Sequence, residues 1–373
     1  MKVMVVGNIV QSLVNFRGPL LHAMVELGHE VVAVAPEEDL HYEEELSRLG
    51  VKYRWVPLDR AGFNPASDLR FMCALRRLMI EERPDVFLGY TIKPVIYGNL
   101  GARLAGVPAR GALITGLGYA FGDDGLKQRL VGLVASVLYA LALAGARVVF
   151  FQNPDDRGEF IRRRLVDPSL ATVVAGSGVD LDRFTSSEPP PPPPVFLLIA
   201  RLIREKGIEE FVEAARDLKE RYPEARFQLL GPTDKNPTAV SPSWIDEQQR
   251  AGVIEYMGVT NDVRPFLHAA SVFVLPSYRE GTPRTVLEAL ATGRPIVTTD
   301  APGCRETVVD GVNGFLVIPR DVRSLTEAME KFILDPELVP RMGLAGLELA
   351  RTRYDVRFVN ADMLHHLGLQ PKG

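Results

Sequence analysis

Two glutamates, Glu280 and Glu288, stand eight positions apart around the predicted start of a helix. Thr282 is a favourable N-cap, Pro283 suits the first helical position, and Gly293 favours the helix end. This spacing places Glu280 in the loop before the helix and Glu288 in its second turn. The N–H groups of a first helical turn attract anions, so the stretch predicts a phosphate site beside two carboxylates. A nucleotide-sugar site is our leading hypothesis for it.

A pair of basic residues, Arg201 and Lys206, follows the apolar run at 195–200. Residues at the carboxyl ends of parallel strands face the ligand crevice of open α/β sheets. Two cations there would balance a diphosphate. We favour this interpretation over surface salt bridges of one or both side chains.

Glu288 lies in the apolar sequence LEALA and has two interpretations. Glu is a strong helix former, so a glutamate within a helix is usually solvated. A carboxylate that faces inward needs a partner, and a ribose diol with its two hydroxyl donors is the partner that we predict.

The elements that would carry these residues alternate between strand and helix in two successive runs. The first run has strands at 3–6, 31–35, 53–57, 86–90 and 110–115 and helices at 18–27, 67–82 and 95–105. The second has strands at 195–200, 226–230, 254–257, 272–275 and 296–299 and helices at 208–222, 242–251, 263–269 and 322–334. Such alternation predicts parallel sheets covered by helices on both faces, so the fold class is α/β with two doubly wound domains.

The tract TSSEPPPPPP at 185–194 separates the two runs. Consecutive prolines favour a stiff, extended segment, which we interpret as a spacer and not as a ligand for a proline-recognition module. A last helix is predicted at 354–367 and could pack on either domain.

Bulk properties exclude several classes of protein. The 373 residues suffice for two cores, and a net charge of -4 gives no reason to expect nucleic acid as the main partner. After the first strand only Gly7 stands in the expected tight turn, so a dinucleotide-dependent dehydrogenase loses its main support. The N-terminal run is too short for a signal peptide and is interpreted as a strand.

Other reactive side chains form no recognisable constellation. Cys73 and Cys304 lack metal-type spacing and are expected to be free thiols. Asp262, His268 and the histidines at 365–366 suggest neither a metal site nor a triad, so we expect surface or hydrogen-bonded residues.

The segment 130–146 carries no charge and is preceded by Lys127 and Arg129. One interpretation is a helix buried between sheet and surface, and another is a helix whose apolar face rests on a bilayer. A membrane span is the least favoured interpretation, because seventeen residues is near the lower limit for a span.

Arg201, Lys206 and the Glu280-x7-Glu288 pattern together resemble the retaining glycosyltransferases of family 4. The likeness covers nearly the whole chain, including NFRGPL, TIKPVIYGNLGARLAG, TGLGYAF and SYREGTPRTVLEALATGRPIV. It implies the GT-B fold, in which two Rossmann-like, doubly wound parallel-sheet domains face each other across a cleft. The wider pattern is similar to bacterial enzymes that extend saccharides on undecaprenyl diphosphate in O-antigen, capsule or glycoprotein glycan assembly.

The resemblance implies roles for individual residues. Arg201 and Lys206 would bind the donor diphosphate and, with Glu280 beside the donor sugar, form the catalytic set. Glu288 would bind the ribose. Backbone amides near Gly281, Thr285 and Val286 would hold the sugar and phosphate, and further donor contacts are implied at Gly7, Gly258 and Val259. The acceptor side is implied at Asn15, Arg17, Thr91, Lys93, Thr115 and Gly116.

One stretch departs from the family pattern. Many relatives have a histidine after the fourth strand of the first domain, where this chain reads YTIKP. Lys93 is therefore expected to take over an anionic contact. The segments 176–184 and 256–263 look like the family's inter-domain crossover and nucleobase loop.

The implied activity is metal-independent and needs no cofactor. A hexose or N-acetylhexosamine would move from a UDP-sugar to a lipid-linked saccharide with retention of configuration, at the inner face of the plasma membrane. Residues 127–147 would supply a peripheral membrane contact. A nucleotide-sugar epimerase, a transferase with a soluble acceptor and a non-catalytic nucleotide-sugar-binding protein remain as alternatives.

The expected domain boundaries follow from the same resemblance. An acceptor-binding domain is expected at 1–182, a Pro-rich linker at 183–194 and a nucleotide-sugar-binding domain at 195–353. Residues 354–373 are expected to pack back on the first domain.

Overall fold

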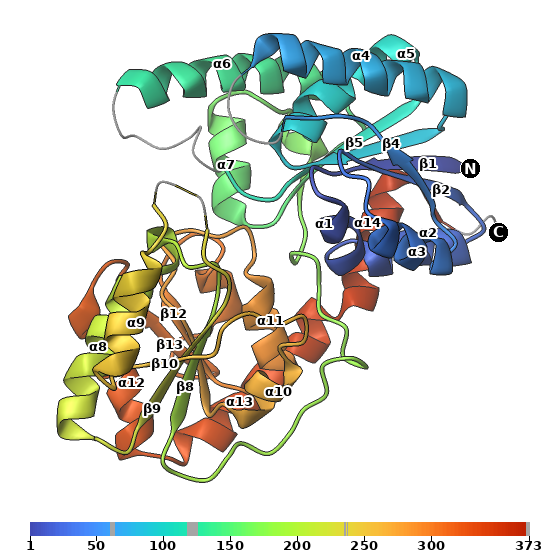
Figure 1. Ribbon diagram of the computed structural model, residues 1–373. Helices are drawn as coiled ribbons and strands as arrows, with labels where there is room; N and C mark the ends of the chain where they lie inside the picture. Colours follow the sequence, from blue (N-terminus) through green and yellow to red (C-terminus); the bar gives the residue numbers. More distant parts are fainter. Residues whose placement is uncertain (60–63, 118–125, 235, 237, 371–373) are drawn as a thin grey trace. The chain divides into compact units, whose positions relative to one another are not determined.

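The computed structural model describes residues 1–59, 64–117, 126–234, 236 and 238–370, with the backbone alone at 126–129 (Figure 1). The chain divides into two compact units. The first unit holds residues 1–177 and 357–373, and the second holds residues 178–356. The expected linker at 183–194 therefore falls within the second unit.

The first unit is built on a seven-stranded sheet of order β3-β2-β1-β4-β5-β6-β7, and every pairing is parallel. Its strands are β1 Lys2–Val6, β2 Glu30–Ala35, β3 Lys52–Trp55, β4 Val86–Tyr90, β5 Ala109–Ile114, β6 Val148–Phe151 and β7 Ala171–Val173. The central strands β1 and β4 are buried almost throughout, because helices cover both faces of the sheet. The strand order reverses between β1 and β4, which is where open sheets of this kind bind ligands.

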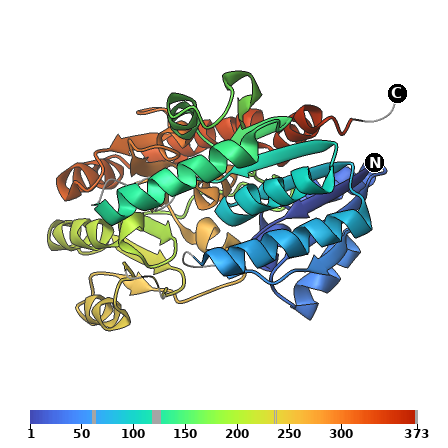
Figure 2. The same ribbon diagram turned by 90° about the horizontal axis from the view of Figure 1, so that it is seen from above.

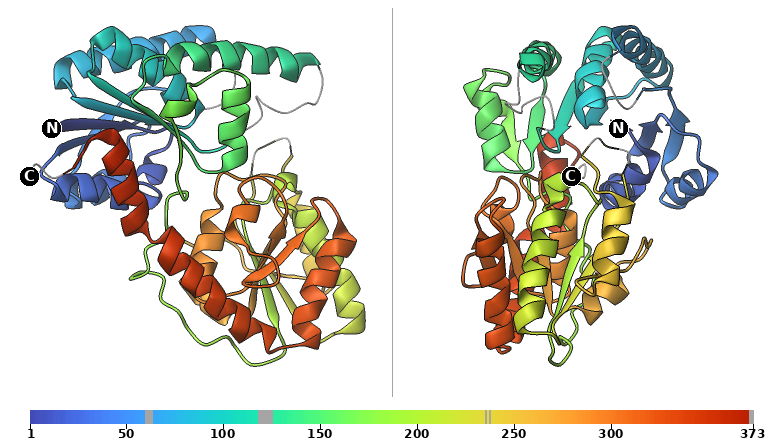
Figure 3. Two further views of the ribbon diagram at one scale, coloured as in Figure 1. Left: turned by 180° about the vertical axis from the view of Figure 1, so that it is seen from behind. Right: turned by 60° about the vertical axis from the view of Figure 1, so that its left-hand side comes forward.

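Helices of the first unit form two layers. On one side lie α4 Pro65–Glu82, α5 Asn99–Ala105 and α6 Leu126–Leu143, which run side by side (Figure 2). On the other side lie α1 Val10–Asn15, α2 Gly18–Glu26, α3 Leu40–Arg48 and α14 Val356–Leu367 (Figures 1 and 3). A π-helical segment, Pro94–Gly98, leads into α5, and α7 Pro154–Arg162 follows β6. Met363, Leu364 and Leu367 of α14 belong to the core of this unit.

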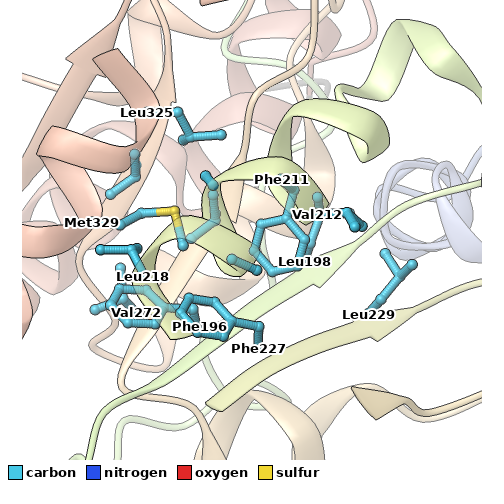
Figure 4. Packing of buried hydrophobic residues seen from close by; sticks show 14 of the residues in the cluster. Phe196, Leu198, Phe211, Val212, Leu218, Phe227, Leu229, Val272, Leu325 and Met329 are labelled. Atoms are coloured by element: carbon cyan, nitrogen blue, oxygen red, sulfur yellow. The ribbon is translucent and has the colours of Figure 1, made fainter. Parts of the chain in front are cut away.

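The second unit has a six-stranded parallel sheet of order β10-β9-β8-β11-β12-β13. Its strands are β8 Val195–Ile199, β9 Arg226–Leu230, β10 Glu255–Tyr256, β11 Val272–Leu275, β12 Ile296–Thr299 and β13 Gly314–Val317. Helices α8 Ile208–Arg221 and α12 Val322–Leu334 cover one face, while α10 Arg264–Ala269 and α11 Arg284–Ala291 lie on the other. Helices α9 Pro242–Arg250 and α13 Leu338–Leu349 complete the unit. Figure 4 shows its core, where Phe196 stacks on Phe227 and Phe211 meets Phe227 edge-on.

These sheets confirm the predicted α/β class with two doubly wound parallel-sheet domains. Among the described elements, helices α1, α3, α7 and α13 and strands β7 and β13 were not predicted, and β6 was indicated only by the strand-like sequence VVFF after the segment 130–146. Both cysteines are free, as expected, with Cys73 exposed and Cys304 buried. Among the helices whose residues are described, none is long and apolar enough to cross a membrane.

A buried arginine, Arg294, holds the first residues of the tract 185–194 against the second unit. Arg294 has no exposed surface, and its guanidinium donates to the carbonyl oxygens of Leu267, His268, Ser187 and Glu188 and to the Ser187 hydroxyl. Burial lowers the pKa of Arg294 to about 10. The start of the spacer is thus packed against its own unit.

Replacing Arg294 with methionine is expected to lower the free energy of unfolding by about 2–4 kcal/mol, because it leaves buried carbonyl groups without donors. Denaturant unfolding of wild type and variant measures the change. Arg323→Met is the matched control, since Arg323 is 88% exposed and pairs along its own helix with Glu327. The control should change stability by less than about 0.5 kcal/mol, and an equal loss in both variants would contradict the role given to Arg294.

Candidate functional site

Three loops of the second unit converge at the carboxyl ends of adjacent strands β8, β11 and β12. The Tyr278 N–H and the Ser277 hydroxyl donate to the Glu205 carbonyl oxygen at 2.9 and 3.0 Å, which ties the β11 loop to the β8 loop. The Glu280 N–H donates to the Pro302 carbonyl oxygen at 2.9 Å, which adds the β12 loop. The strand order reverses between β8 and β11, so these loops occupy the position where doubly wound sheets bind nucleotides.

An ion pair between Lys206 and Glu280 lies at this junction. The exposed fractions of the two side chains are 19% and 14%, so both charges are shielded yet reachable from solvent. A lysine held beside a carboxylate can exchange that partner for a phosphate group without moving far. The structure thus brings together two of the three residues predicted to be catalytic.

The third of these residues, Arg201, makes a different contact. Its guanidinium lies 2.9 Å from the Asp234 carboxylate, and its side chain is 57% exposed. Arg201 therefore forms a surface salt bridge, which was the alternative interpretation for this basic pair. The pair is too exposed to hold the guanidinium firmly.

A glycine of the β12 loop supports the backbone at Glu280. Gly303 has a φ of +82°, and a Cβ atom there would overlap the carbonyl oxygens of Glu280 and Gly281. The neighbouring Cys304 thiol is buried, and this burial together with the Glu280 charge raises its pKa to about 12. Cys304 is therefore a neutral packing residue under the loop.

Glu288 faces inward and is only 6% exposed, so its interpretation as a solvated helix residue is wrong. Its Oε1 lies 2.8 Å from Nε of Arg284, one turn earlier on α11. Burial raises the pKa of Glu288, and the charges of Arg284 and Arg183 partly offset that rise. The predicted need for a partner is met here by Arg284, which sequence reasoning missed although the two residues are four positions apart.

Helix α11 begins one residue later than predicted. Pro283, with φ -72° and ψ 110°, is the N-cap, and Thr282 lies before it. The Val286 N–H donates to the Pro283 carbonyl oxygen at 3.1 Å. The prediction of Thr282 as the cap is therefore wrong, and the Val286 amide that was expected to hold the ligand is already bonded within the first turn. Thr285 lies in that turn, and Gly281 lies in the loop before it.

The predicted nucleobase loop follows the edge strand β10. Gly258 has a φ of +72° and open space around it, and Val259 is 65% exposed. Arg264 donates to both oxygens of Asp262, and this contact lowers the pKa of the carboxyl to about 2. Asp262 is thus a paired surface residue, as expected.

The first unit has its own cluster at the point where its strand order reverses. Gly7 follows β1, and a Cβ atom there would overlap the hydroxyl of Tyr90, the last residue of β4. The Tyr90 hydroxyl is 2.6 Å from the Ser12 hydroxyl, and the Arg17 guanidinium lies 5.3 Å from the Tyr90 ring centre. Arg17 is 3% exposed, and burial raises the pKa of Tyr90 to about 12. Tyr90 and Ser12 were not singled out from the sequence.

Thr91, directly after β4, adopts a φ of 67°, which is uncommon for a β-branched residue. Its hydroxyl is buried, and no hydrogen-bond partner for it is found in the described part of the chain. Strain of this kind is concentrated at ligand sites. Thr115 and Gly116 follow the next strand, β5, and Asn15 ends α1, so these predicted residues stand at neighbouring strand and helix ends.

Lys93 is already neutralised within its own unit. Its ammonium group lies 2.7 Å from the Asp68 carboxylate and 2.6 Å from the Asp59 carbonyl oxygen, and the residue is 8% exposed. A ligand anion would have to replace a buried carboxylate. In the described ranges, no group of three or more His, Cys, Asp or Glu side chains could hold a metal ion.

Comparisons with known proteins match both units to families of glycosyltransferases. Residues 17–176 match the glycosyl transferase 4-like domain, and residues 179–348 match the glycosyl transferases group 1 family. A Campylobacter jejuni protein, N,N'-diacetylbacillosaminyl-diphospho-undecaprenol alpha-1,3-N-acetylgalactosaminyltransferase, is 31% identical over 90% of this chain and 89% of its own. The Escherichia coli UDP-Gal:alpha-D-GlcNAc-diphosphoundecaprenol alpha-1,3-galactosyltransferase is 28% identical over 77% and 76%.

Solved structures share the fold at lower identity. Anabaena HepE, in complex with UDP and glucose, has a TM-score of 0.78 at 17% identity and covers 99% of both chains. Sucrose-phosphate synthase from Thermosynechococcus elongatus has a TM-score of 0.80 at 17% identity and covers 98% of both. With two parallel-sheet units and these relatives along nearly its whole length, the chain belongs to the family 4-like, group 1 glycosyltransferases of the GT-B fold.

Proposed function

We propose that the chain transfers a hexose or N-acetylhexosamine from a UDP-sugar to a saccharide linked to undecaprenyl diphosphate. The observation that carries the proposal is the Lys206–Glu280 pair at the reversal of strand order, together with the buried Glu288 on the helix that follows the Glu280 loop. The names of both relatives specify a diphospho-undecaprenol acceptor, and one specifies UDP-Gal as the donor.

The donor diphosphate carries negative charge that must be balanced as it leaves. Lys206 would turn from Glu280 to the diphosphate, and Arg201 would leave its exposed contact with Asp234 to join it. Once Lys206 has turned away from it, Glu280 would lie next to the donor sugar. Two cations meet the electrostatic need, so we propose that no metal ion is required. Turnover should then be the same with and without a chelator.

The buried Glu288 carboxylate would accept hydrogen bonds from the ribose hydroxyls. Arg284 holds one of its oxygens in place, which fixes the direction in which the carboxylate points. The loop at Gly258 and Val259 would contact the base, since it is open and exposed. Gly281 and Thr285 would face the sugar and phosphate.

The acceptor would bind to the first unit near Asn15, Arg17, Thr91 and the residues after β5. Arg17 supplies a buried cation for the acceptor diphosphate, and its stacking on Tyr90 fixes its position. The α linkage in both relatives' names supports retention, because UDP-sugars of this kind are α-configured. The leaving diphosphate would accept the proton of the attacking hydroxyl. The reaction would take place at the inner face of the plasma membrane, where both substrates meet.

UDP release with a panel of UDP-sugars and two kinds of acceptor tests the proposal. We expect release only when a lipid-linked saccharide is present. Transfer only to water-soluble sugars would favour the soluble-acceptor alternative, and conversion of the UDP-sugar without any acceptor would favour an epimerase. Binding of UDP-sugars without turnover under any condition would favour a non-catalytic protein.

Donor affinity is expected to depend on pH through Glu288. Burial places the pKa of this carboxyl above its ordinary 4.5, so protonation occurs as pH falls through that raised value. The protonated form is the weaker acceptor for ribose hydroxyls, and KM for the donor should therefore rise at acidic pH.

Glu288→Gln should raise the donor KM by about tenfold or more at neutral pH and remove this acidic rise. Steady-state kinetics between neutral and acidic pH measure both effects. Glu327→Gln removes an exposed carboxylate that pairs with an arginine at the same four-residue spacing, and it should leave KM unchanged. If the donor KM of Glu288→Gln still rises at acidic pH, a group other than Glu288 is responsible for the pH dependence.

A further inference from the structure

The side chain of Tyr278 lies at the starts of two neighbouring helices of the second unit. Tyr278 stands two positions before Glu280, in the loop that follows β11. Its hydroxyl donates to the carboxylate of Glu210, in the first turn of α8. The Arg320 guanidinium lies 4.6 Å from the centre of its ring, and Arg320 directly precedes Asp321, the N-cap of α12. Because α8 and α12 pack against each other (Figure 1), this one side chain connects the Glu280 loop to both helices.

Both partners of Tyr278 are arranged to hold its side chain. A phenol that donates to a carboxylate makes a charge-assisted hydrogen bond, which is stronger than a neutral one. The second carboxylate oxygen of Glu210 is buried and has no hydrogen-bond partner in the described part of the chain, so the carboxylate relies on the Tyr278 hydroxyl. Arg320 has a φ of +62°, a left-handed backbone that is uncommon for an arginine. Such strain persists where the surrounding structure requires one arrangement.

The Tyr278 hydroxyl is not suited to act as an acid or base itself. Burial raises its pKa, the hydrogen bond and charge of Glu210 raise the pKa further, and the charge of Arg320 partly offsets the rise. The hydroxyl therefore stays protonated at neutral pH and points at Glu210. Any contribution of this side chain to a reaction must come through the position of its loop.

The same loop is packed against the residues that carry Lys206. Gly207, the N-cap of α8, follows Lys206 directly, and a Cβ atom there would overlap the carbonyl oxygen of Pro276. The start of α8 therefore positions Lys206 directly, and it positions Glu280 through the side chain of Tyr278.

We propose that Tyr278, Glu210 and Arg320 form a brace that positions Glu280 against Lys206 for sugar transfer. Groups that act on a substrate are held in productive geometry by neighbours whose own side chains are locked by packing and hydrogen bonds. The inference rests on the proposed function for the reaction that is measured, whereas the brace itself is measured without donor or acceptor.

Replacing Tyr278 with phenylalanine is expected to lower kcat by about tenfold or more. Phenylalanine keeps the ring beside Arg320 but leaves the Glu210 carboxylate without its donor, so the Glu280 loop is no longer held in one position. A displacement of about 1 Å at a catalytic group costs on the order of 10²-fold in rate. The donor KM should change by less than about threefold, because the nucleotide would keep its proposed contact with Glu288.

Tyr222→Phe is the matched control, because Tyr222 makes the same set of contacts at the opposite end of α8. Its hydroxyl lies 2.9 Å from the Glu330 carboxylate, and the Arg221 guanidinium lies 5.5 Å from its ring centre. This variant should keep kcat at the wild-type value. Equal losses of kcat in Tyr222→Phe and Tyr278→Phe would mean that general stability, and not the Glu280 loop, accounts for the effect.

Variants of Glu210 separate a positioning contact from packing. Glu210→Gln keeps an oxygen that accepts from Tyr278, and it should retain kcat within about threefold. Glu210→Ala should lose as much kcat as Tyr278→Phe, and the double variant should lose no more than either alone. Arg320→Met removes the cation from the ring and should lower kcat by about two- to fivefold. Additive losses at Tyr278 and Glu210 would overturn the brace.

The reactivity of Cys304 reports the position of the loop without any substrate. Cys304 is fully buried, and its Sγ lies 3.8 Å from the Ser277 carbonyl oxygen. Cys73→Ser leaves Cys304 as the only cysteine, so alkylation by iodoacetamide measures how often the loop opens. In this background Tyr278→Phe should accelerate alkylation by about tenfold or more, because it removes a charge-assisted hydrogen bond. Tyr222→Phe should leave the rate of alkylation unchanged.

The two measurements tell failure of the brace from failure of the proposed function. Faster alkylation in Tyr278→Phe, with no turnover of any UDP-sugar by wild type, would contradict the proposed function alone. In an active enzyme the brace requires that Tyr278→Phe both lower kcat and expose Cys304. Either change without the other, or neither of them, would overturn the proposal.

Discussion

Replacing Lys206 with alanine is expected to lower kcat by about 10²- to 10³-fold. The Lys206 ammonium is shielded by its loop and lies beside Glu280, and in the proposed reaction it would balance the negative charge that develops on the leaving diphosphate. The loss of one preorganised donor at such a charge costs this much in other enzymes. Because the donor nucleotide would keep its proposed contacts at Glu288 and the base loop, KM should change far less than kcat. Steady-state kinetics with saturating acceptor separate the two.

Arg204→Ala is the matched control for Lys206. Arg204 lies two residues earlier in the same loop, is 64% exposed and pairs with Glu209 at 3.1 Å. The control should retain kcat within about twofold, since an exposed ion pair contributes little. Equal kcat losses in the two variants would mean that the loop's fold, and not the Lys206 charge, determines turnover. Thermal unfolding of both variants checks that removal of the Lys206 side chain has not unfolded the loop.

Replacing Gly303 with alanine should lower kcat by about 10²-fold without any change in a charged group. A Cβ atom at Gly303 overlaps the carbonyl oxygens of Glu280 and Gly281, so the loop must move away by a large fraction of an ångström or more. A displacement of about 1 Å at a catalytic group costs on the order of 10²-fold in rate. Because the loop backbone carries Glu280, its contact with Lys206 would be lost as well.

Gly311→Ala isolates this overlap from backbone strain. Gly311 has a φ of +75°, close to the +82° of Gly303, but a Cβ atom there would meet nothing within 4 Å. Both substitutions carry the penalty of a left-handed backbone, about 1 kcal/mol of stability. Wild-type kcat in Gly311→Ala with a loss in Gly303→Ala is the expected pattern. Wild-type kcat in both would show that the position of the Glu280 loop is not critical.

The sheets were predictable because their strands are apolar on both faces. Runs such as 195–199 and 272–275 suit strands covered by helices on two sides, and the alternation with helices then implies parallel order. Short or mixed elements gave no such signal. The sequence GFLV of β13 exposes its two middle residues in part, and α3 is mostly polar and buries Leu46 alone.

For the candidate site, only its location at the carboxyl ends of the strands was predictable. Lys206 and Glu280 each follow an apolar strand, which predicts the same edge of a sheet for both. That they meet depends on β8 and β11 being neighbours although β9 and β10 come between them in sequence. The role of Gly303 depends on a third loop reaching the Glu280 backbone, which no local pattern reveals.

Individual side-chain contacts were the least predictable part. Glu288 was expected to need a partner, and the four-residue spacing to Arg284 could have indicated this pairing, whereas the burial of Glu288 depends on how α11 packs. The left-handed backbone of Thr91 runs against the preference of a β-branched residue and has no sequence signature. In the sequence YTIKP, Lys93 suggests a cation available to a ligand. In the structure it pairs with the buried Asp68 of α4, 25 positions earlier.

The configuration of the product tests the central claim most directly. We would incubate the enzyme with a UDP-sugar that supports release of UDP and with an undecaprenyl-diphosphate-linked acceptor, isolate the extended lipid and determine the new anomeric centre by NMR. The account predicts an α-glycosidic bond to the lipid-linked saccharide, formed in the presence of a chelator and strongly reduced with Lys206→Ala. A β-linked product, or no transfer to the lipid-linked acceptor while soluble sugars are extended, would contradict it.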